Sequence, residues 1–89
     1  MSRFQGGVLG LMVVPKKLFK IGEVMRYSSL SRQTIHNYTM LGLITEEERT
    51  ESGHRLYGEE VFARIQEIET LKKKKTLKEI RQLFLDRES

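Results

Sequence analysis

The stretch SRQTIHNYTMLG, residues 31–42, decides the fold. Ser31 can cap the start of a helix and Gly42 can end one, so the stretch predicts a short helix from Arg32 to about Leu41. One side of this helix is apolar at helical spacing, and the residues expected to anchor it from behind are Ile35, Tyr38 and Leu41. The other side is polar and can meet a partner.

Shorter patterns flank this helix on both sides. Before it, the apolar spacing in IGEVM (21–25) predicts one or two helical turns that end at the serine pair 28–29. After it, LI (43–44) and RLY (55–57) are expected to form two short strands, joined by a polar loop with a turn at Gly53. The pattern therefore predicts two helices in close succession, followed by a β-ribbon.

Two further helices are expected downstream. Apolar residues recur at helical spacing between positions 61 and 71, and TLKE (76–79) is a capping box that opens a last helix. Four helices with a two-stranded β wing after the second one define a winged helix-turn-helix, a mainly α fold. Two short helices cannot bury their apolar faces alone, so the later helices must cover them. We expect this domain to occupy residues 18–89.

The first 17 residues are of a different kind. GG (6–7) and Gly10 disfavour a helix, while Val8–Val14 is an apolar run without a partner pattern nearby. We expect residues 1–17 to be a leader that is either flexible or pairs two subunits through Val8–Val14. Met12 could serve as an alternative start.

Composition limits the class of protein. The 89 residues fit one domain, and the absence of cysteine excludes a disulfide, a thiolate metal site and a thiol nucleophile. The longest apolar run is too short to span a bilayer and lacks a signal-peptide cleavage site, so we expect a cytoplasmic protein without membrane contact. The formal net charge of +4 favours a polyanionic partner.

No group of residues has the spacing of a catalytic centre. EEE (46–48) is consecutive, so these side chains diverge on an extended chain and do not act as a pair. His36 and His54 supply at most two ligands, fewer than the three protein ligands of a catalytic zinc site. No glycine-rich phosphate loop precedes a helix. We therefore expect no enzyme, no catalytic residue, no cofactor and no metal.

The polar side of the helix in residues 31–42 suits DNA. Arginine can bridge two acceptors of guanine in the major groove, and glutamine or asparagine can bridge adenine. Residues of these types gather near the start of the helix, and the candidate DNA-facing set is Arg32, Gln33, Thr34, His36 and Asn37. The alternative is an ordinary solvated helix face. Tyr38 could place its ring in the core and its hydroxyl on a phosphate.

The polar loop is harder to reconcile with DNA. Arg55, beside the turn at Gly53, has the reach to contact a phosphate, and the alternative is an ion pair with a nearby glutamate. Residues 45–60 contain six acids and two cations. Their glutamates must therefore point away from phosphate or pair with Arg49.

Six motifs occur in order along the chain: IGEV (21–24), SRQTI (31–35), Tyr38, GLI (42–44), GHRLY (53–57) and LKEI (77–80). Together they resemble the DNA-binding domain of the MerR family of bacterial transcription regulators. The resemblance implies a dimer on an inverted or direct DNA repeat, with the second helix in the major groove and the wing along the backbone. By position it implies that one set of residues faces the major groove: Arg32, Gln33, His36 and Asn37. It implies that a second set supports phosphate contacts or the wing: Tyr38, Arg55 and Tyr57.

The chain departs from the family pattern in three respects, one of which is that the proline usual in the first half of the wing is missing. It has His36–Asn37 where the family usually has Arg-Tyr, and it shows neither the long dimerising helix nor an effector domain. It is therefore more similar to the small branch without an effector domain, such as BldC, or to the nitrogen regulators GlnR and TnrA, which are said to pair through residues ahead of the domain. This similarity implies a homodimer, no small-molecule effector, and Val8–Val14 as the pairing segment.

We thus expect a sequence-specific DNA-binding transcription regulator whose partner is double-stranded DNA. Two alternatives stay open. An excisionase-like or architectural protein would use the same fold to bend DNA. A protein-interaction module would follow if the wing were too acidic for DNA.

Overall fold

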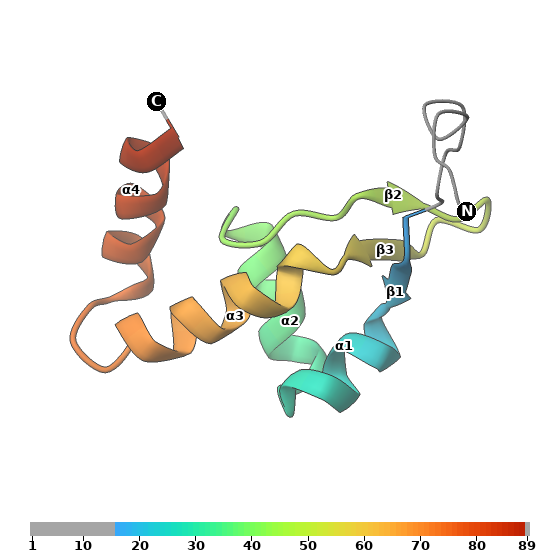
Figure 1. Ribbon diagram of the computed structural model, residues 1–89, viewed down its shortest axis with the longest axis horizontal. Helices are drawn as coiled ribbons and strands as arrows, with labels where there is room; N and C mark the ends of the chain where they lie inside the picture. Colours follow the sequence, from blue (N-terminus) through green and yellow to red (C-terminus); the bar gives the residue numbers. More distant parts are fainter. Residues whose placement is uncertain (1–15, 89) are drawn as a thin grey trace, which may run out of the picture.

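The computed structural model describes residues 16–88, where three short strands and four helices form a mainly α domain (Figure 1). In chain order the elements are β1 (Leu18–Lys20), α1 (Ile21–Ser28), α2 (Arg32–Met40), β2 (Glu48–Arg49), β3 (Arg55–Gly58), α3 (Glu60–Leu71) and α4 (Leu77–Glu88). The winged helix-turn-helix expected from the sequence is confirmed. The proposed pairing segment Val8–Val14 lies outside the described residues.

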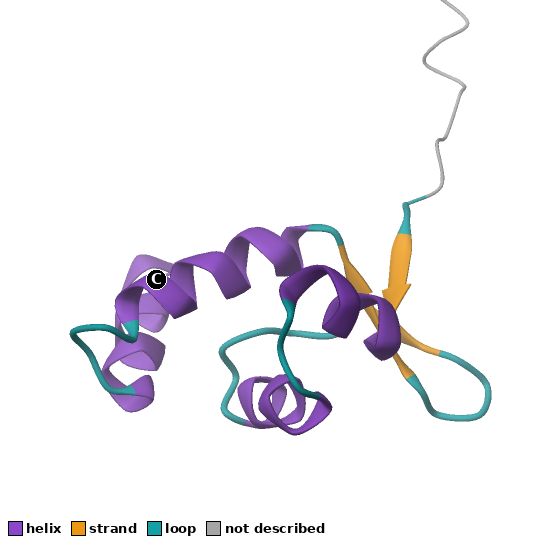
Figure 2. Ribbon diagram, turned by 90° about the horizontal axis from the view of Figure 1, so that it is seen from below, coloured by secondary structure: helices purple, strands orange, loops and turns teal. Residues whose placement is uncertain are grey.

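The three strands form one antiparallel sheet with β3 at its centre, in the order β1–β3–β2. β1 pairs Phe19 with Tyr57, and β2 pairs Arg49 with Arg55. A strand from the start of the domain therefore adds to the two-stranded wing that the sequence predicts. The loop between β2 and β3 extends from the edge of this sheet (Figure 2).

Leu43 and Ile44 do not form the strand expected of them. Their backbone N–H groups both donate to the Tyr38 carbonyl, at 2.9 and 3.3 Å, so the chain folds back over the end of α2. Gly42 permits this reversal because its φ is +78°, a conformation that side chains disfavour. Both apolar side chains enter the core, and the strand that pairs with β3 begins only at Glu48.

The core lies where α1, α2 and the sheet meet α3. Its buried side chains are Val24, Ile35, Tyr38, Leu43, Ile44, Tyr57, Val61, Ile65, Ile68, Ile80 and Phe84. The predicted anchoring role is confirmed for Ile35, which is 0% exposed, but it is wrong for Leu41, which is 42% exposed. α2 ends at Met40, so the chain leaves the helix at Leu41 and the core position is filled by Leu43.

α3 runs between the sheet at one end and α4 at the other (Figure 1). The predicted capping box opens α4: the Glu79 N–H donates to the Thr76 hydroxyl at 3.1 Å, and the Thr76 N–H donates to the Glu79 carboxylate at 2.8 Å. Phe84 of α4 is buried, and the Arg64 guanidinium of α3 lies 3.8 Å from its ring centre. α3 and α4 thus complete a core that the first two helices are too short to form alone.

Candidate nucleic-acid interface

Hydrogen bonds at Ser31 set the start of α2. The Ser31 hydroxyl accepts from the Thr34 N–H at 3.1 Å and donates to the Thr34 hydroxyl at 2.9 Å, so the predicted N-cap is confirmed. This cap satisfies a backbone donor that would otherwise lack a partner, and it fixes the first turn at Arg32. Arg32 and Gln33 extend from that turn as exposed side chains.

The polar face of α2 is uncovered over most of its length. Arg32, Gln33 and Asn37 are exposed, whereas Thr34 and His36 are half-buried. The Gln33 side-chain amide donates to the Asn37 side-chain oxygen at 3.0 Å, which joins the two side chains across one turn. Amides of this kind can bridge the donor and acceptor atoms of adenine, and arginine can bridge those of guanine. None of the protein's own described helices covers this edge.

Tyr38 and Tyr57 lie in the core, away from the surface expected of DNA-contacting residues. Tyr38 is 2% exposed, and its hydroxyl donates to Glu69 at 2.5 Å and accepts from Lys72 Nζ at 3.1 Å. Tyr57 is fully buried and shares a hydrogen bond of 2.7 Å with the Thr39 hydroxyl. Burial raises the pKa of Tyr38, so its hydroxyl stays protonated and keeps the bond to Glu69. Both positions favour a role in supporting α2 and do not favour direct phosphate contact.

A groove of about 790 Å³ lies between the starts of α1 and α2 and the wing loop. Its titratable lining residues are Lys20, Glu23, Arg26, Arg32, His54 and Arg55. The one carboxylate among them, Glu23, accepts from the Lys20 backbone N–H at 2.9 Å and caps α1. Within residues 16–88, no carboxylate forms an ion pair with Arg26 or Arg32. Arg55 is ion-paired with Glu46, so Lys20, Arg26 and Arg32 are the cations at this groove without an ion pair inside the described residues, and an excess of positive charge of this kind attracts a phosphate backbone.

Lys20 and Arg26 are functional candidates that the sequence analysis missed. They belong to the start of the domain, and only the packing of α1 against α2 and β3 brings them to the groove that Arg32 and Arg55 line. Sequence spacing carries no sign of that arrangement. The available signal is the excess of cations over acids between residues 16 and 32.

The wing loop between β2 and β3 is closed by Thr50. Its carbonyl accepts from the Gly53 N–H at 2.9 Å, and its hydroxyl accepts from the His54 N–H at 3.0 Å. Gly53 has a φ of +88°, so the predicted turn at this position is confirmed. His54 is exposed on the turn and shares a hydrogen bond of 3.2 Å with the Ser52 hydroxyl. The loop is therefore fixed by short-range hydrogen bonds and contributes nothing to the buried core.

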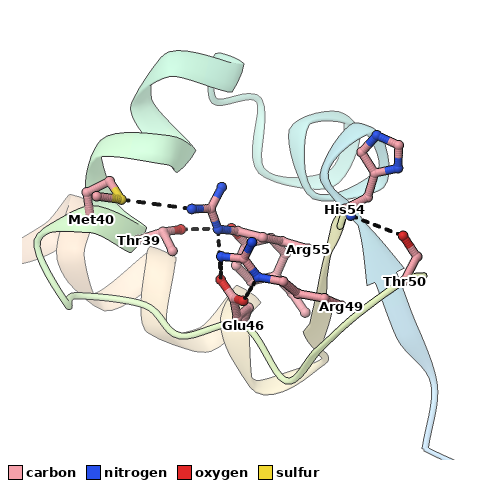
Figure 3. A network of polar contacts seen from close by, with 8 residues as sticks. Thr39, Met40, Glu46, Arg49, Thr50, His54 and Arg55 are labelled. Carbon is pink, nitrogen blue, oxygen red and sulfur yellow. Dashed lines mark hydrogen bonds and ion pairs between the residues drawn. The ribbon is translucent and has the colours of Figure 1, made fainter. Parts of the chain in front are cut away.

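Glu46, which precedes β2, forms one network with Arg49 and Arg55 of the wing (Figure 3). The Glu46 carboxylate accepts from Arg55 Nε at 2.7 Å, and it accepts from both Nε and Nη2 of Arg49. The hydrogen bond from Arg49, followed by that from Arg55, holds the pKa of Glu46 below its ordinary value. The expected pairing of a loop glutamate with Arg49 is confirmed. For Arg55, the structure contains the ion pair with a nearby glutamate that was the alternative to a phosphate contact.

Other kinds of site have no counterpart in the described part of the chain. Between residues 16 and 88, no three histidine, aspartate or glutamate side chains are grouped as metal ligands would be. None of the helices in that range combines the length and the apolar character that crossing a membrane requires.

Sequence comparisons match the segment that contains α1, α2 and the wing. The family model for the MerR family regulatory protein matches residues 20–57, from the end of β1 into β3. The nodulation protein NolA of Bradyrhizobium diazoefficiens is 35% identical over 57 residues, which cover 64% of this chain and 24% of that protein. The mercuric resistance operon regulatory protein of Bacillus cereus is 43% identical over 47 residues, which cover 53% of this chain and 36% of that protein. The chain thus spans only 24% and 36% of the lengths of these two relatives.

Solved structures show the same arrangement of elements. A MerR-family transcriptional regulator from Bacillus cereus superposes with a TM-score of 0.69 at 26% identity, over 78% of this chain and 52% of that one. The N-terminal part of MtaN, the multidrug transporter activator of Bacillus subtilis, gives a TM-score of 0.69 at 28% identity, over 74% of this chain and 63% of that one. Residues 20–57 thus match the MerR family model, and the described part of the chain has the winged helix-turn-helix fold of solved MerR-family regulators.

Proposed function

We propose that this protein is a sequence-specific DNA-binding regulator of transcription that acts as a homodimer on a repeated operator. The observation that carries the proposal is the groove between α1, α2 and the wing loop. Around it, Lys20, Arg26 and Arg32 have no ion-pair partner within residues 16–88. Cations of this kind bind phosphate, and the exposed edge of α2 begins at the same groove with Arg32.

The side chains divide into three roles in this proposal. Those that read base edges in the major groove are Arg32, Gln33 and Asn37, with Thr34 and His36 at the flank of the same face. Those that contact the phosphate backbone are Lys20, Arg26 and Arg55. Tyr38 and Tyr57 act from within the core, because their hydroxyl groups bond to α3 and α2 and keep the recognition helix in place.

The homodimer is supported by the size of the domain and its resemblance to proteins that bind repeats. One helix of nine residues reaches only a few base pairs, so two copies on two half-sites give the specificity that one copy lacks. The apolar run Val8–Val14 is the proposed pairing segment. Its deletion should leave a folded monomer that binds a single half-site.

The proposal is tested by selecting bound sites from a random pool of DNA duplexes and then measuring affinity against salt. We expect a motif with two half-sites, and a slope of log K against log salt of about −7 to −9 for a dimer that neutralises four or five phosphates per subunit. The control is the variant Arg32→Ala, for which the motif selected from the same pool should show a weaker base preference. Head-to-tail occupancy along DNA without an effect on transcription would favour the architectural alternative, and no retention of DNA at low salt would reject DNA binding altogether.

A further inference from the structure

None of the proposed DNA contacts involves Glu46. It lies between the wing and the end of α2, and its two carboxylate oxygens face the arginines of the wing (Figure 3). Its side chain is 23% exposed, and that of Arg55 is 25% exposed. The pair is therefore more shielded from solvent than the ion pair of Lys16 with Glu47, whose lysine side chain is 63% exposed.

The chemistry of this contact matches that of an arginine on DNA. A guanidinium binds a carboxylate and a phosphate with the same fork of N–H donors. Arg49 donates to Glu46 from Nε and Nη2, which form the edge of the guanidinium that can also bind a phosphate. Arg55 donates from Nε to Glu46, and among residues 16–88 its Nη2 has only the Met40 sulfur, a weak acceptor at 3.9 Å. One carboxylate thus engages both arginines of the wing.

We propose that Glu46 is an internal competitor for DNA phosphate, which engages Arg49 and Arg55 in the free protein and keeps the affinity for DNA low. The inference rests on the proposed DNA-binding function. A phosphate that binds the wing must displace this carboxylate or share the guanidinium groups with it. In both cases the negative charge of Glu46 offsets part of the attraction between the wing and DNA.

The neighbouring residue Glu48 provides a matched control. Glu48 lies on β2, is exposed, and forms no ion pair with any of residues 16–88. Glu46→Gln and Glu48→Gln change the net charge equally and differ by two positions in the chain. A general electrostatic effect appears in both variants, whereas release of the arginines appears only in Glu46→Gln.

The experiment measures the dissociation constant of the full chain for one fixed DNA duplex by fluorescence anisotropy at about 0.1 M salt, where charges interact over about 10 Å. We expect Glu46→Gln to bind about two- to fivefold more tightly than the parent protein, the size expected from removing weak, partly exposed ion pairs. Glu48→Gln should gain less than about twofold. In an Arg49→Ala/Arg55→Ala background, the two glutamine substitutions should have equal effects.

A second measurement does not depend on the stability of any variant. The side-chain Nε–H signals of Arg49 and Arg55 are followed by NMR while the same duplex is added to the parent protein. Both signals should shift as the carboxylate partner is replaced. Signals that stay in place while DNA binds would overturn the inference.

The remaining outcomes separate the inference from the proposed function. Affinity of Glu46→Gln equal to or weaker than that of Glu48→Gln, in a parent protein that binds DNA, overturns the competitor role and leaves DNA binding intact. A weaker Glu46→Gln would make Glu46 a positioning residue for the arginines. A parent protein that binds no duplex at low salt overturns the proposed function itself, and this shows before any variant is compared.

Discussion

The recognition helix α2 and the wing belong to the same proposed interface, but they are held in place in different ways. α2 is anchored by buried side chains, with Ile35 at 0% and Tyr38 at 2% exposure, and its Arg32 forms no ion pair within residues 16–88. The wing loop is held by hydrogen bonds at Thr50, and a carboxylate engages its arginines. The core therefore fixes the helix that is proposed to read bases, whereas surface ion pairs hold the arginines of the wing, which is proposed to contact the DNA backbone.

The largest expected effect concerns the anchoring of α2. Ile35→Ala removes a fully buried side chain and should lower the free energy of unfolding by about 2–5 kcal/mol, because it leaves a cavity behind the helix. Thr50→Ala, which removes two exposed side-chain hydrogen bonds in the wing, to the His54 N–H and the Ser52 hydroxyl, should lower it by only about 1 kcal/mol. Urea denaturation measures both. Equal losses would contradict the distinction between a packed helix and a hydrogen-bonded wing.

The second effect concerns the reading of bases. Arg32→Ala should remove about 1–3 kcal/mol of discrimination between the selected site and a variant site, because arginine supplies a bidentate contact to guanine. Binding to both duplexes is compared by anisotropy at one salt concentration. Arg81→Ala on the exposed surface of α4 is the matched control. A selected motif unchanged by Arg32→Ala would remove the main support for α2 as the reading element.

The third effect concerns the backbone contact of the wing. Arg55→Ala should weaken binding to all sequences alike and make the slope of log K against log salt shallower by about 1 per subunit. The expected loss is smaller than for Arg32→Ala, since Arg55 starts from an ion pair with Glu46. A sequence-dependent loss would show that the wing also reads bases. The assignment of base reading to α2 alone would then be wrong.

The smallest expected effect is the change of thermal stability at acidic pH. Because the pKa of Glu46 is lowered in the folded protein, its ion pairs contribute stability above the ordinary glutamate pKa of 4.5, and this contribution is lost as the pH falls below that value. The melting temperature of the parent protein should therefore drop more between pH 6 and about pH 3.5 than that of Glu46→Gln. The side-chain amide signals of Gln33 and Asn37 should not follow this titration, since no acid lies in their hydrogen-bonded pair.

Most of the elements could be predicted because their signals are local. Ser31 is bonded to Thr34 and Thr76 to Glu79, so each cap acts within one turn of its own helix. Gly53 adopts the positive φ that its turn needs, for a reason contained in one residue.

Local patterns misassigned Leu43 and Leu41 because their places depend on how the chain turns after α2. Two adjacent apolar residues suit a buried strand and a buried loop equally well, and the backbone bonds to Tyr38 decided for the loop. Leu41 has the spacing of a core residue, but the helix ends before it, so its side chain stays 42% exposed. Neither outcome is encoded in the spacing itself.

By itself, the sequence determined where α2 and α4 begin, which face of α2 is polar, and which family the order of motifs resembles, because these depend on neighbours within a few positions. Only the tertiary structure decided that Lys20 and Arg26 share a groove with Arg32, and that Glu46 reaches both Arg49 and Arg55. The physical reason is that charges act through space. Which charges lie within reach of one another is set by the packing of α1, α2 and the sheet around a common core.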